Sequence, residues 1–294
     1  MTMMLIVGTD PNKDLPVTVG EVKRDGDFLV VGENKIARTQ GTGAMISAAL
    51  ATTTYLKKAP PHVLLVGDPG DGKGTRLLYK YLTENIDKMK PDFVTLHYCL
   101  PIMALIKQFC DAVNKMSHRP FLIADAGGMY AAKAAGLAEQ FDVFTPDFSE
   151  IAFLADPYAT HPAYVGKHLF GADHTGVPHM IDEAYKYHAA PKLLVVKGAT
   201  DYIAENGKIV AEINSPNVPM LEPIGGTGDT ITGLVSALIY SGFPPREAAI
   251  MSCKINRLAG EAAHVTPATK VRQFVDHFQD VFSQVIPDSI PSGS

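Results

Sequence analysis

Ile224-Gly-Gly-Thr-Gly-Asp-Thr230 runs directly into a helical pattern over residues 231–239, and this junction decides the fold. Glycine permits positive φ and a close approach of the backbone to a ligand, while a helix that begins here offers unpaired N–H groups to an anion. The stretch therefore predicts a phosphate-binding loop made of Gly225, Gly226, Thr227 and Gly228. An ordinary glycine-rich turn, in which Thr227 or Asp229 caps the helix, is the alternative interpretation.

Asp229 occupies an unusual position in this stretch. A carboxylate in the first turn of a phosphate-binding helix repels the ligand unless the carboxylate takes part in the chemistry. We therefore expect Asp229 to act as a general base.

Length, charge and composition favour an enzyme of small molecules. The chain has 294 residues and a formal net charge of −5, with Lys and Glu mixed along it, so it lacks the basic face that a nucleic-acid partner requires. Nothing divides the chain clearly, and we expect a single α/β domain over residues 1–286. Residues 287–294 are rich in Pro and Ser and are expected to be a disordered tail.

The cysteines and the apolar segments point to the cytoplasm. Cys99, Cys110 and Cys253 lie in apolar or helical surroundings without a C-x-x-C spacing, which indicates reduced thiols rather than disulfides or a zinc site. The N-terminus has no basic region followed by an export segment, and no stretch reaches the roughly 20 apolar residues of a membrane span. We expect a soluble protein without a membrane partner.

Short apolar runs alternate with helical patterns through the middle of the chain. The predicted strands are Val63–Val66, Phe93–Leu96, Phe121–Ala124, Val143–Thr145 and Leu193–Val196. The predicted helices are Met45–Leu56, Thr75–Ile86, Ile102–Lys115, Tyr130–Gln140 and His179–His188. This alternation predicts a mainly parallel sheet with helices on both faces, with ligands at the carboxyl ends of the strands.

Two hairpins and a helical end complete the predicted architecture. Pro16–Val22 and Phe28–Val31 flank one turn signal, and Tyr202–Ala204 and Lys208–Ile213 flank Glu205-Asn-Gly207. Helices are expected at 229–241, 246–263 and 269–285.

Gly67-Asp-Pro-Gly-Asp-Gly-Lys-Gly-Thr75 is a second glycine-rich stretch between a strand and a helix, and it fits G-x-x-x-x-G-K. Asp68 and Asp71 stand where phosphates would lie, and few arginines follow to clamp them. The stretch could be a true phosphate loop, a plain strand-to-helix turn, or a glycine-rich wall of the substrate pocket.

The order of landmarks resembles the ribokinase-like superfamily, and within it the carbohydrate-kinase-like domain of ADP/ATP-dependent NAD(P)H-hydrate dehydratases. The resemblance covers roughly residues 35–265, and its specific motif is Gly226-Thr-Gly-Asp229. Weaker landmarks precede it in family order: Gly41-Thr-Gly-Ala44, Leu122-Ile-Ala-Asp125-Ala126, Thr145-Pro-Asp-Phe-Ser-Glu150 and Val196-Lys-Gly-Ala-Thr200. The resemblance implies a ribokinase-like three-layer sandwich, here without a full lid domain.

The resemblance also implies roles for individual residues. Asp229 would be the base that deprotonates a substrate hydroxyl, and the loop of residues 225–228 would form an anion hole for the transferred phosphate. ATP or ADP would lie against Lys197, Gly198 and Thr200. The substrate side would include Ala44, Asp68, His97, Asp125 and Asp147.

The chain departs from the dehydratase pattern on the substrate side. Asp147 replaces a His in the Thr-Pro-His-Pro-Gly-Glu run, and His97-Tyr-Cys-Leu-Pro101 stands in place of a Gly-Pro-Gly-Leu-Gly loop. Asp147 and Glu150 also resemble the Asn-x-x-Glu motif by which ribokinase-like kinases organise Mg²⁺, and we expect them to hold that ion. A helix N-terminal capping box is the alternative.

A His-rich segment, residues 158–179, could cover the pocket, contact another subunit or bind a metal, although its spacing does not match a metal cage. We expect a nucleotide-dependent dehydratase of a hydrated nicotinamide cofactor that forms a homo-oligomer. A small-molecule kinase acting on a sugar or a vitamin-precursor alcohol, and a non-catalytic nucleotide sensor, are the alternatives.

Overall fold

A nine-stranded sheet forms the centre of the computed structural model, which describes residues 2–161 and 176–287. The strands run in the order β12 (Lys208–Ile213), β11 (Asp201–Glu205), β10 (Leu193–Val196), β9 (Val143–Phe144), β8 (Phe121–Ala124), β7 (Phe93–His97), β1 (Met4–Asp10), β6 (His62–Gly67) and β2 (Thr18–Glu21). The six strands from β10 to β6 in this order are parallel, whereas β2, β11 and β12 are antiparallel to their neighbours.

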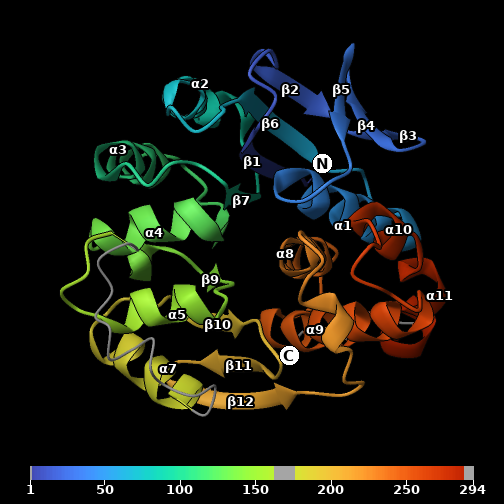
Figure 1. The fold of residues 1–294 in the computed structure, drawn as a ribbon. Helices are drawn as coiled ribbons and strands as arrows, with labels where there is room; N and C mark the ends of the chain where they lie inside the picture. The colour runs from blue at the N-terminus through green and yellow to red at the C-terminus, as the bar shows by residue number, and fades with distance from the viewer. Residues whose placement is uncertain (1, 162–175, 288–294) are drawn as a thin grey trace.

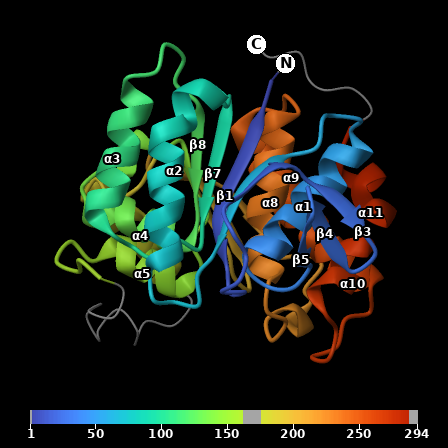
Figure 2. The same ribbon diagram turned by 90° about the horizontal axis from the view of Figure 1, so that it is seen from above.

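Helices cover both faces of the sheet and make a three-layer sandwich (Figure 1; the view in Figure 2 is turned by 90°). One face carries α2 (Lys73–Met89), α3 (Met103–Asn114), α4 (Ala126–Ala134), α5 (Phe148–Ala155) and α7 (Val177–Lys186). The other carries α1 (Thr42–Tyr55), α8 (Thr227–Tyr240), α9 (Pro245–Ala262), α10 (Val271–Asp276) and α11 (Phe278–Val285). Among the described residues, short 3-10 turns lie at Ala138–Gln140 and Pro219–Leu221. The predicted fold class is confirmed.

The core is divided between the two faces by the alternation of side chains along each strand. On β1, Leu5 and Val7 join the core under α2 to α7, whereas Met4 and Ile6 join the core under α1. All four are buried. Strands buried on both faces read as continuous apolar runs, which explains why the β-α alternation could be read from the sequence.

The central strand β1 was missed by the sequence analysis, which placed no strand before residue 16. Its apolar run near the N-terminus was considered only as an export signal. Close packing leaves room only for glycine at position 8 of this strand, because a Cβ there would lie 2.6 Å from the carbonyl oxygen of His97 and 2.7 Å from Oγ1 of Thr42. The strand therefore helps to bring β7 and α1 together.

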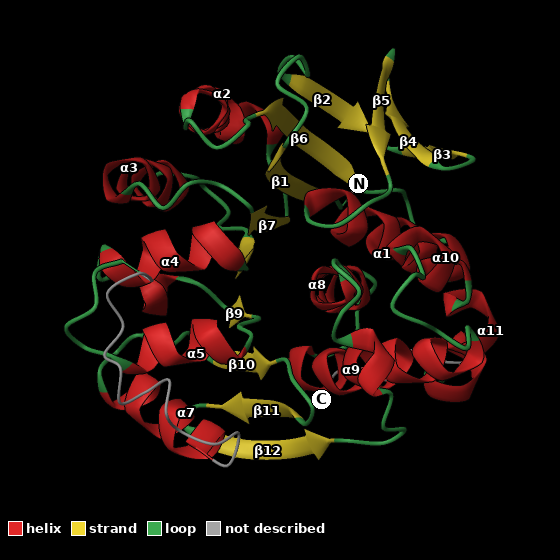
Figure 3. Cartoon of the chain, in the orientation of Figure 1, coloured by secondary structure: helices red, strands yellow, loops and turns green. Residues whose placement is uncertain are grey.

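The first predicted hairpin is wrong, and the second is confirmed. β2 pairs with β6 of the main sheet, while β3 (Lys23–Asp25), β4 (Phe28–Val31) and β5 (Asn34–Ala37) form a separate sheet (Figure 3). Leu29 and Ile36 of this small sheet share a core with Ile46 of α1, and this burial outweighs the expected pairing. The later hairpin turns through Asn206 and Gly207, both at positive φ.

Helix boundaries also differ from expectation at several positions. α4 begins four positions earlier than predicted because Asp125 caps it and accepts a hydrogen bond from Ala126 N. The helix expected over 269–285 is divided at His277 into α10 and α11. The described helices include none with the length and apolar character that a bilayer span requires.

Candidate active site

The carboxyl ends of the parallel strands and the N-termini of α1 and α8 converge on one group of charged side chains. His97 ends β7, Asp125 follows β8, Lys197 follows β10, and Asp229 lies in the first turn of α8. This is the edge at which parallel α/β sheets bind ligands.

Asp229 is held by both of its carboxylate oxygens. Oδ1 lies 2.9 Å from Nε2 of His97, and Oδ2 accepts a 2.8 Å hydrogen bond from Gly41 N at the start of α1. Its side chain retains 14% exposure. Burial raises the pKa of Asp229, but the hydrogen bond and charge of His97 and the charge of Lys197 outweigh burial and leave the pKa below its usual value. The carboxylate is therefore fixed, ionised and accessible.

His97 is fully buried behind Asp229. Its Nδ1 lies 3.1 Å from Oγ1 of Thr42, and this hydroxyl also lies 2.9 Å from the carbonyl oxygen of Thr9. The sequence predicts that His97 contacts substrate, but the ring is enclosed and contacts Asp229 instead.

Lys197 and Asp125 form a buried ion pair close to Asp229. Nζ of Lys197 lies 3.0 Å from both oxygens of Asp125, and Thr232 donates a 2.6 Å hydrogen bond to Oδ2. Burial lowers the pKa of Lys197, yet the negative charges of Asp125 and Asp229 outweigh burial and raise it. The ammonium therefore stays charged in a buried position.

The loop before α8 is shaped by its glycines. Gly226 is the N-cap at φ 104° and carries no side chain to cap the helix. A Cβ at Gly228 would lie 3.8 Å from Nζ of Lys197. The N–H groups of the first turn and the ammonium of Lys197 therefore face the same space, which suits an anion. The hydroxyl of Thr227 donates to the carbonyl oxygens of Leu221 and Ile224 and supports the loop itself.

The segment that follows Lys197 is held by a charged pair that the sequence analysis missed. Asp201 accepts from Gly198 N at 3.0 Å and pairs with Arg257 of α9 at 2.8 Å. Arg257 also donates to the carbonyl oxygens of Gly198 and Ala199. A basic residue within the long helical pattern of α9 gave no signal of this contact, because the contact joins segments far apart in the chain. Thr200, a predicted nucleotide contact, lies in this segment and is partly exposed.

In the second glycine-rich stretch, Gly67–Thr75, the backbone N–H groups donate hydrogen bonds to an acid of the same stretch, Asp68. The carboxylate of Asp68 accepts hydrogen bonds from the backbone N–H groups of Gly70, Gly72 and Thr75, at 2.9, 3.1 and 2.7 Å, and from Oγ1 of Thr75 at 2.8 Å. Lys73 points to solvent and pairs with Asp71. The N–H groups that a phosphate would need are thus directed at Asp68, which argues against a phosphate loop here.

Asp147 and Glu150 form the capping box that the sequence analysis held as the alternative. Asp147 accepts from Glu150 N at 2.8 Å, and Glu150 accepts from Asp147 N at 2.7 Å. Glu150 is buried, and burial together with the charge of Asp125 raises its pKa well above the usual value, so its neutral form is favoured. Asp147 is exposed. Of the two, Asp147 suits a hydrated cation and Glu150 does not.

The remaining predicted residue, Ala44, is buried where α1 meets the α8 loop. A Cβ at Gly226 would lie 3.1 Å from that of Ala44. Beside it, Tyr98 lies over Gly41, 3.6 Å from the position of a Cβ there, and is 52% exposed. Burial and the charge of Asp229 raise the pKa of Tyr98 to about 12, so it stays protonated. Tyr98 thus places an aromatic ring close to Asp229, a feature that the sequence does not predict.

His97, Asp125 and Asp229 bring ligand-type atoms within 4.8 Å of one another. The arrangement already satisfies them, because Lys197 and Thr232 donate to Asp125 while His97 and Gly41 contact Asp229. The ammonium beside Asp125 disfavours a metal ion at the same place. We therefore treat these residues as a hydrogen-bonded network.

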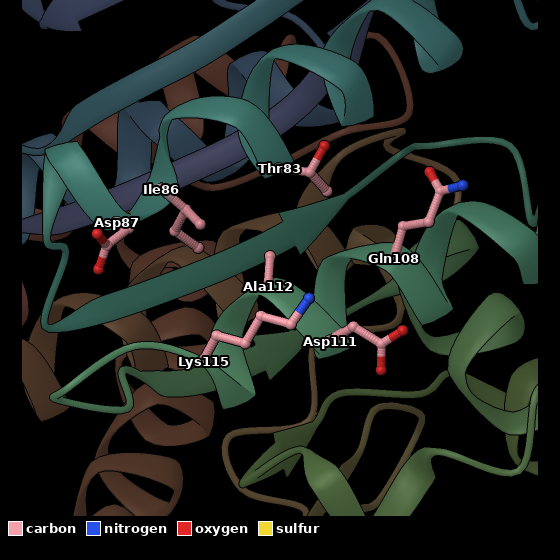
Figure 4. Close-up of a pocket in the computed structure, with 7 residues that line it drawn as sticks. All are labelled: Thr83, Ile86, Asp87, Gln108, Asp111, Ala112 and Lys115. Atoms are coloured by element: carbon pink, nitrogen blue, oxygen red, sulfur yellow. The ribbon is translucent and has the colours of Figure 1, made fainter.

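An open groove of about 510 Å³ lies apart from this network, between the C-terminal halves of α2 and α3 (Figure 4). Its lining mixes Ile86 and Ala112 with charged side chains such as Asp87 and Lys115. It lies at the end of the helices opposite to the carboxyl ends of the strands. Most of the His-rich segment and the predicted tail, residues 162–175 and 288–294, lie outside the described residues.

Comparisons with known proteins identify a matching family model and several relatives. A family model described as NAD(P)H-hydrate dehydratase (Carb_kinase) matches residues 98–275. Uncharacterized protein MJ1337 of Methanocaldococcus jannaschii is 42% identical over 232 residues, which cover 79% of this chain and 95% of that protein. The ADP-dependent (S)-NAD(P)H-hydrate dehydratase of Cenarchaeum symbiosum is 35% identical over 101 residues, 33% of each chain.

Solved structures share the fold at low sequence identity. The ADP/ATP-dependent NAD(P)H-hydrate dehydratase of Bacillus subtilis, co-crystallised with ATP and Mg²⁺, superposes with a TM-score of 0.59 at 16% identity, over 97% of this chain and 89% of that one. A mutant of phosphofructokinase-2 from Escherichia coli gives a TM-score of 0.55 at 13% identity, over 97% and 99%.

Proposed function

The chain belongs to the NAD(P)H-hydrate dehydratase family, and we propose that it uses ATP or ADP to dehydrate a hydrated nicotinamide cofactor. One observation carries the proposal: the ionised carboxylate of Asp229 lies beside an N-terminal helix loop that the ammonium of Lys197 also faces. A base next to an anion site suits the transfer of a phosphoryl group to a substrate hydroxyl.

The first step is phosphorylation. Asp229 takes the proton of the substrate hydroxyl as that oxygen bonds to the terminal phosphorus of the nucleotide, and the bond from phosphorus to its bridging oxygen breaks. The N–H groups of the α8 loop and Lys197 stabilise the negative charge on the transferred group. Elimination of phosphate from the phosphorylated carbon, with loss of a proton from the neighbouring carbon, then completes the dehydration.

Mg²⁺ would offset the charge of the nucleotide phosphates in this step. Asp147 is the residue that suits it, since its carboxylate is exposed, while Glu150 is buried in the capping box. The segment from Lys197 to Thr200, held by Arg257, would support the nucleotide.

The substrate side supports a second candidate. His97 is enclosed behind the base and Tyr98 forms an exposed wall, and both stand where the family pattern has a glycine-rich loop. A remodelled substrate wall favours a different small alcohol, so a kinase whose reaction ends at phosphorylation remains the alternative.

Incubation of the protein with hydrated NADH, Mg²⁺ and either ATP or ADP tests the proposal. We expect NADH absorbance to recover, and we expect Asp229→Asn to lower the rate by about 10²–10⁴-fold while nucleotide binding persists. A panel of small alcohols, followed by release of the nucleotide product, is run in parallel. Nucleotide turnover on one alcohol without NADH recovery would favour the kinase. A cellular or biochemical output that Asp229→Asn leaves intact would favour a nucleotide sensor.

The wider setting follows from the same proposal. We infer a cytoplasmic protein whose partners are a nucleotide and a small molecule, since its thiols at Cys99, Cys110 and Cys253 are free and buried. Light scattering tests the expected homo-oligomer.

A further inference from the structure

His97 connects the base to the interior of the protein. It faces charged groups from several elements: Asp229 on α8 at 2.9 Å, and Asp125 after β8 at 3.9 Å. Lys197 after β10 contacts both carboxylate oxygens of the same Asp125, including the Oδ2 that lies nearest His97. The phenol of Tyr98 lies edge-on to the imidazole, with the ring centroids 4.4 Å apart. The protonation state of His97 therefore determines the charge balance of the whole site.

The protons along this chain of contacts can be counted, beginning at its inner end. The carbonyl oxygen of Thr9 can only accept, so its 2.9 Å contact with Oγ1 of Thr42 uses the single hydroxyl proton of Thr42. Oγ1 of Thr42 can then only accept from the ring. Nδ1 of His97, 3.1 Å away, must carry a proton and donate it.

The other ring nitrogen faces the base. A neutral imidazole with its proton on Nδ1 would present the lone pair of Nε2 to Oδ1 of Asp229 at 2.9 Å, where two acceptors would repel. One more proton is required, on His97 or on Asp229. Asp229 accepts from Gly41 N and lies in the positively polarised first turn of α8, and both features favour its ionised form.

We infer that His97 is a buried imidazolium ion that holds Asp229 ionised and oriented, and that it acts as a positioning residue for the base. Its catalytic role rests on the proposed function, whereas its protonation state does not. The network then contains two cations, His97 and Lys197, opposite two carboxylates, Asp125 and Asp229. This balance accounts for the burial of His97, Asp125 and Lys197 beside the partly exposed Asp229.

The inference also determines where the substrate proton goes. Both ring nitrogens of an imidazolium already carry protons, so a proton accepted by Asp229 cannot pass inward through His97. It stays on the carboxyl group until solvent or the departing phosphate takes it. His97 is therefore not a relay of the kind in which histidine itself removes the substrate proton.

Nitrogen NMR of histidine-labelled protein, without nucleotide, tests the protonation state directly. We expect one histidine to keep directly bonded protons on both ring nitrogens through about pH 6.5, where an ordinary imidazole loses one. The exposed His188 serves as the internal reference, and His97→Gln assigns the signal. A His97 ring with one bare nitrogen at neutral pH would overturn the inference, whatever the enzyme does.

Two variants separate charge from hydrogen bonding. His97→Gln can still donate to Asp229 but carries no charge, so we expect the acid limb of the kcat/KM profile to move to higher pH by roughly one unit or more. Thr42→Val removes the acceptor of Nδ1 and should let the ring lose a proton near neutral pH, while Thr42→Ser should retain both ring protons. An unmoved acid limb in His97→Gln would refute the positioning role. Absence of turnover in the unaltered protein would instead refute the proposed function and leave the NMR result standing.

Discussion

Lys197 places its ammonium 3.0 Å from both carboxylate oxygens of Asp125, and its side chain also lies against the helix loop at Gly228. The buried ammonium of Lys197 therefore contacts two different parts of the site. It neutralises a buried acid, and it would supply positive charge to the proposed anion site.

We expect Lys197→Met to lose both functions. Nucleotide affinity should fall because the ammonium is gone, and the free energy of unfolding should fall by about 3 kcal/mol or more because Asp125 is left charged and unpaired. Denaturant unfolding and nucleotide titration measure the two effects. The double variant Lys197→Met with Asp125→Asn should recover stability without recovering affinity. If the double variant is no more stable than the single one, the ion pair is not the cause.

Gly226 and Gly225 offer a matched pair for testing the loop. Gly226→Ala would force a Cβ at φ 104° to within 3.0 Å of the backbone of Gln40 and 3.1 Å of Ala44. Gly225→Ala would meet the flexible end of Gln40, at 2.6 Å, without positive φ. We expect nucleotide affinity to fall about tenfold or more in Gly226→Ala, because the loop must shift, and to change little in Gly225→Ala. Equal losses would show that the loop geometry is not what the nucleotide recognises.

Asp68 should matter for stability rather than for nucleotide binding. Asp68→Ala leaves the N–H groups of Gly70, Gly72 and Thr75 without their acceptor and should cost about 2–3 kcal/mol. Thr75→Val removes only the hydroxyl and should cost less. Thermal unfolding and nucleotide titration check both, and a large loss of nucleotide affinity in Asp68→Ala would mean that this loop belongs to the binding site.

The same residue contributes to acid sensitivity. Burial raises the pKa of Asp68, but its hydrogen bonds with Thr75, Gly70 and Gly72 outweigh burial and leave the pKa below its usual value. Its stabilising effect is therefore complete above the unfolded pKa of about 3.9 and is lost as pH falls through the lower folded pKa.

Glu150 should have the opposite pH dependence. Its raised folded pKa means that the folded state keeps a proton which the unfolded state loses above about pH 4.3, so stability falls as pH rises, by up to about 1.4 kcal/mol per unit. Glu150→Gln keeps both capping contacts and has no proton to lose. We expect the variant to gain stability relative to the unaltered protein in urea unfolding as the pH rises from about 5 upward, above the unfolded pKa. A constant difference between the two proteins over that range would contradict the assignment.

The sequence predicted those parts of the fold that depend on local patterns. The parallel strands, the Asn206-Gly207 hairpin and the helix after Gly226 follow from periodicity and turn chemistry. β1 was missed because a short apolar run near a terminus has no flanking pattern to identify it. The hairpin before residue 31 failed because burial against α1 depends on contacts that no local pattern encodes.

The site shows the same division. Asp229 and its glycine loop could be predicted because the residues next to them form a recognisable motif. The contact between Thr42 and His97 could not, because it joins residues far apart in the chain. The contacts of Arg257 with Asp201 and Gly198 could not be predicted for the same reason. His97 could be predicted at its strand end, but its partner Thr42 packs against Gly8, which lies on the missed strand β1.

The acid inside the Gly67–Thr75 loop has a consequence for competition between ligands. Asp68 is covalently tethered to the N–H groups that it occupies, so its effective concentration there is millimolar or higher, without any diffusion step. A phosphate in solution would have to displace this resident carboxylate and also approach its negative charge. No side chain caps α8 at Gly226, so under the proposed function we expect a free nucleotide to bind at the α8 loop rather than at Gly67–Thr75.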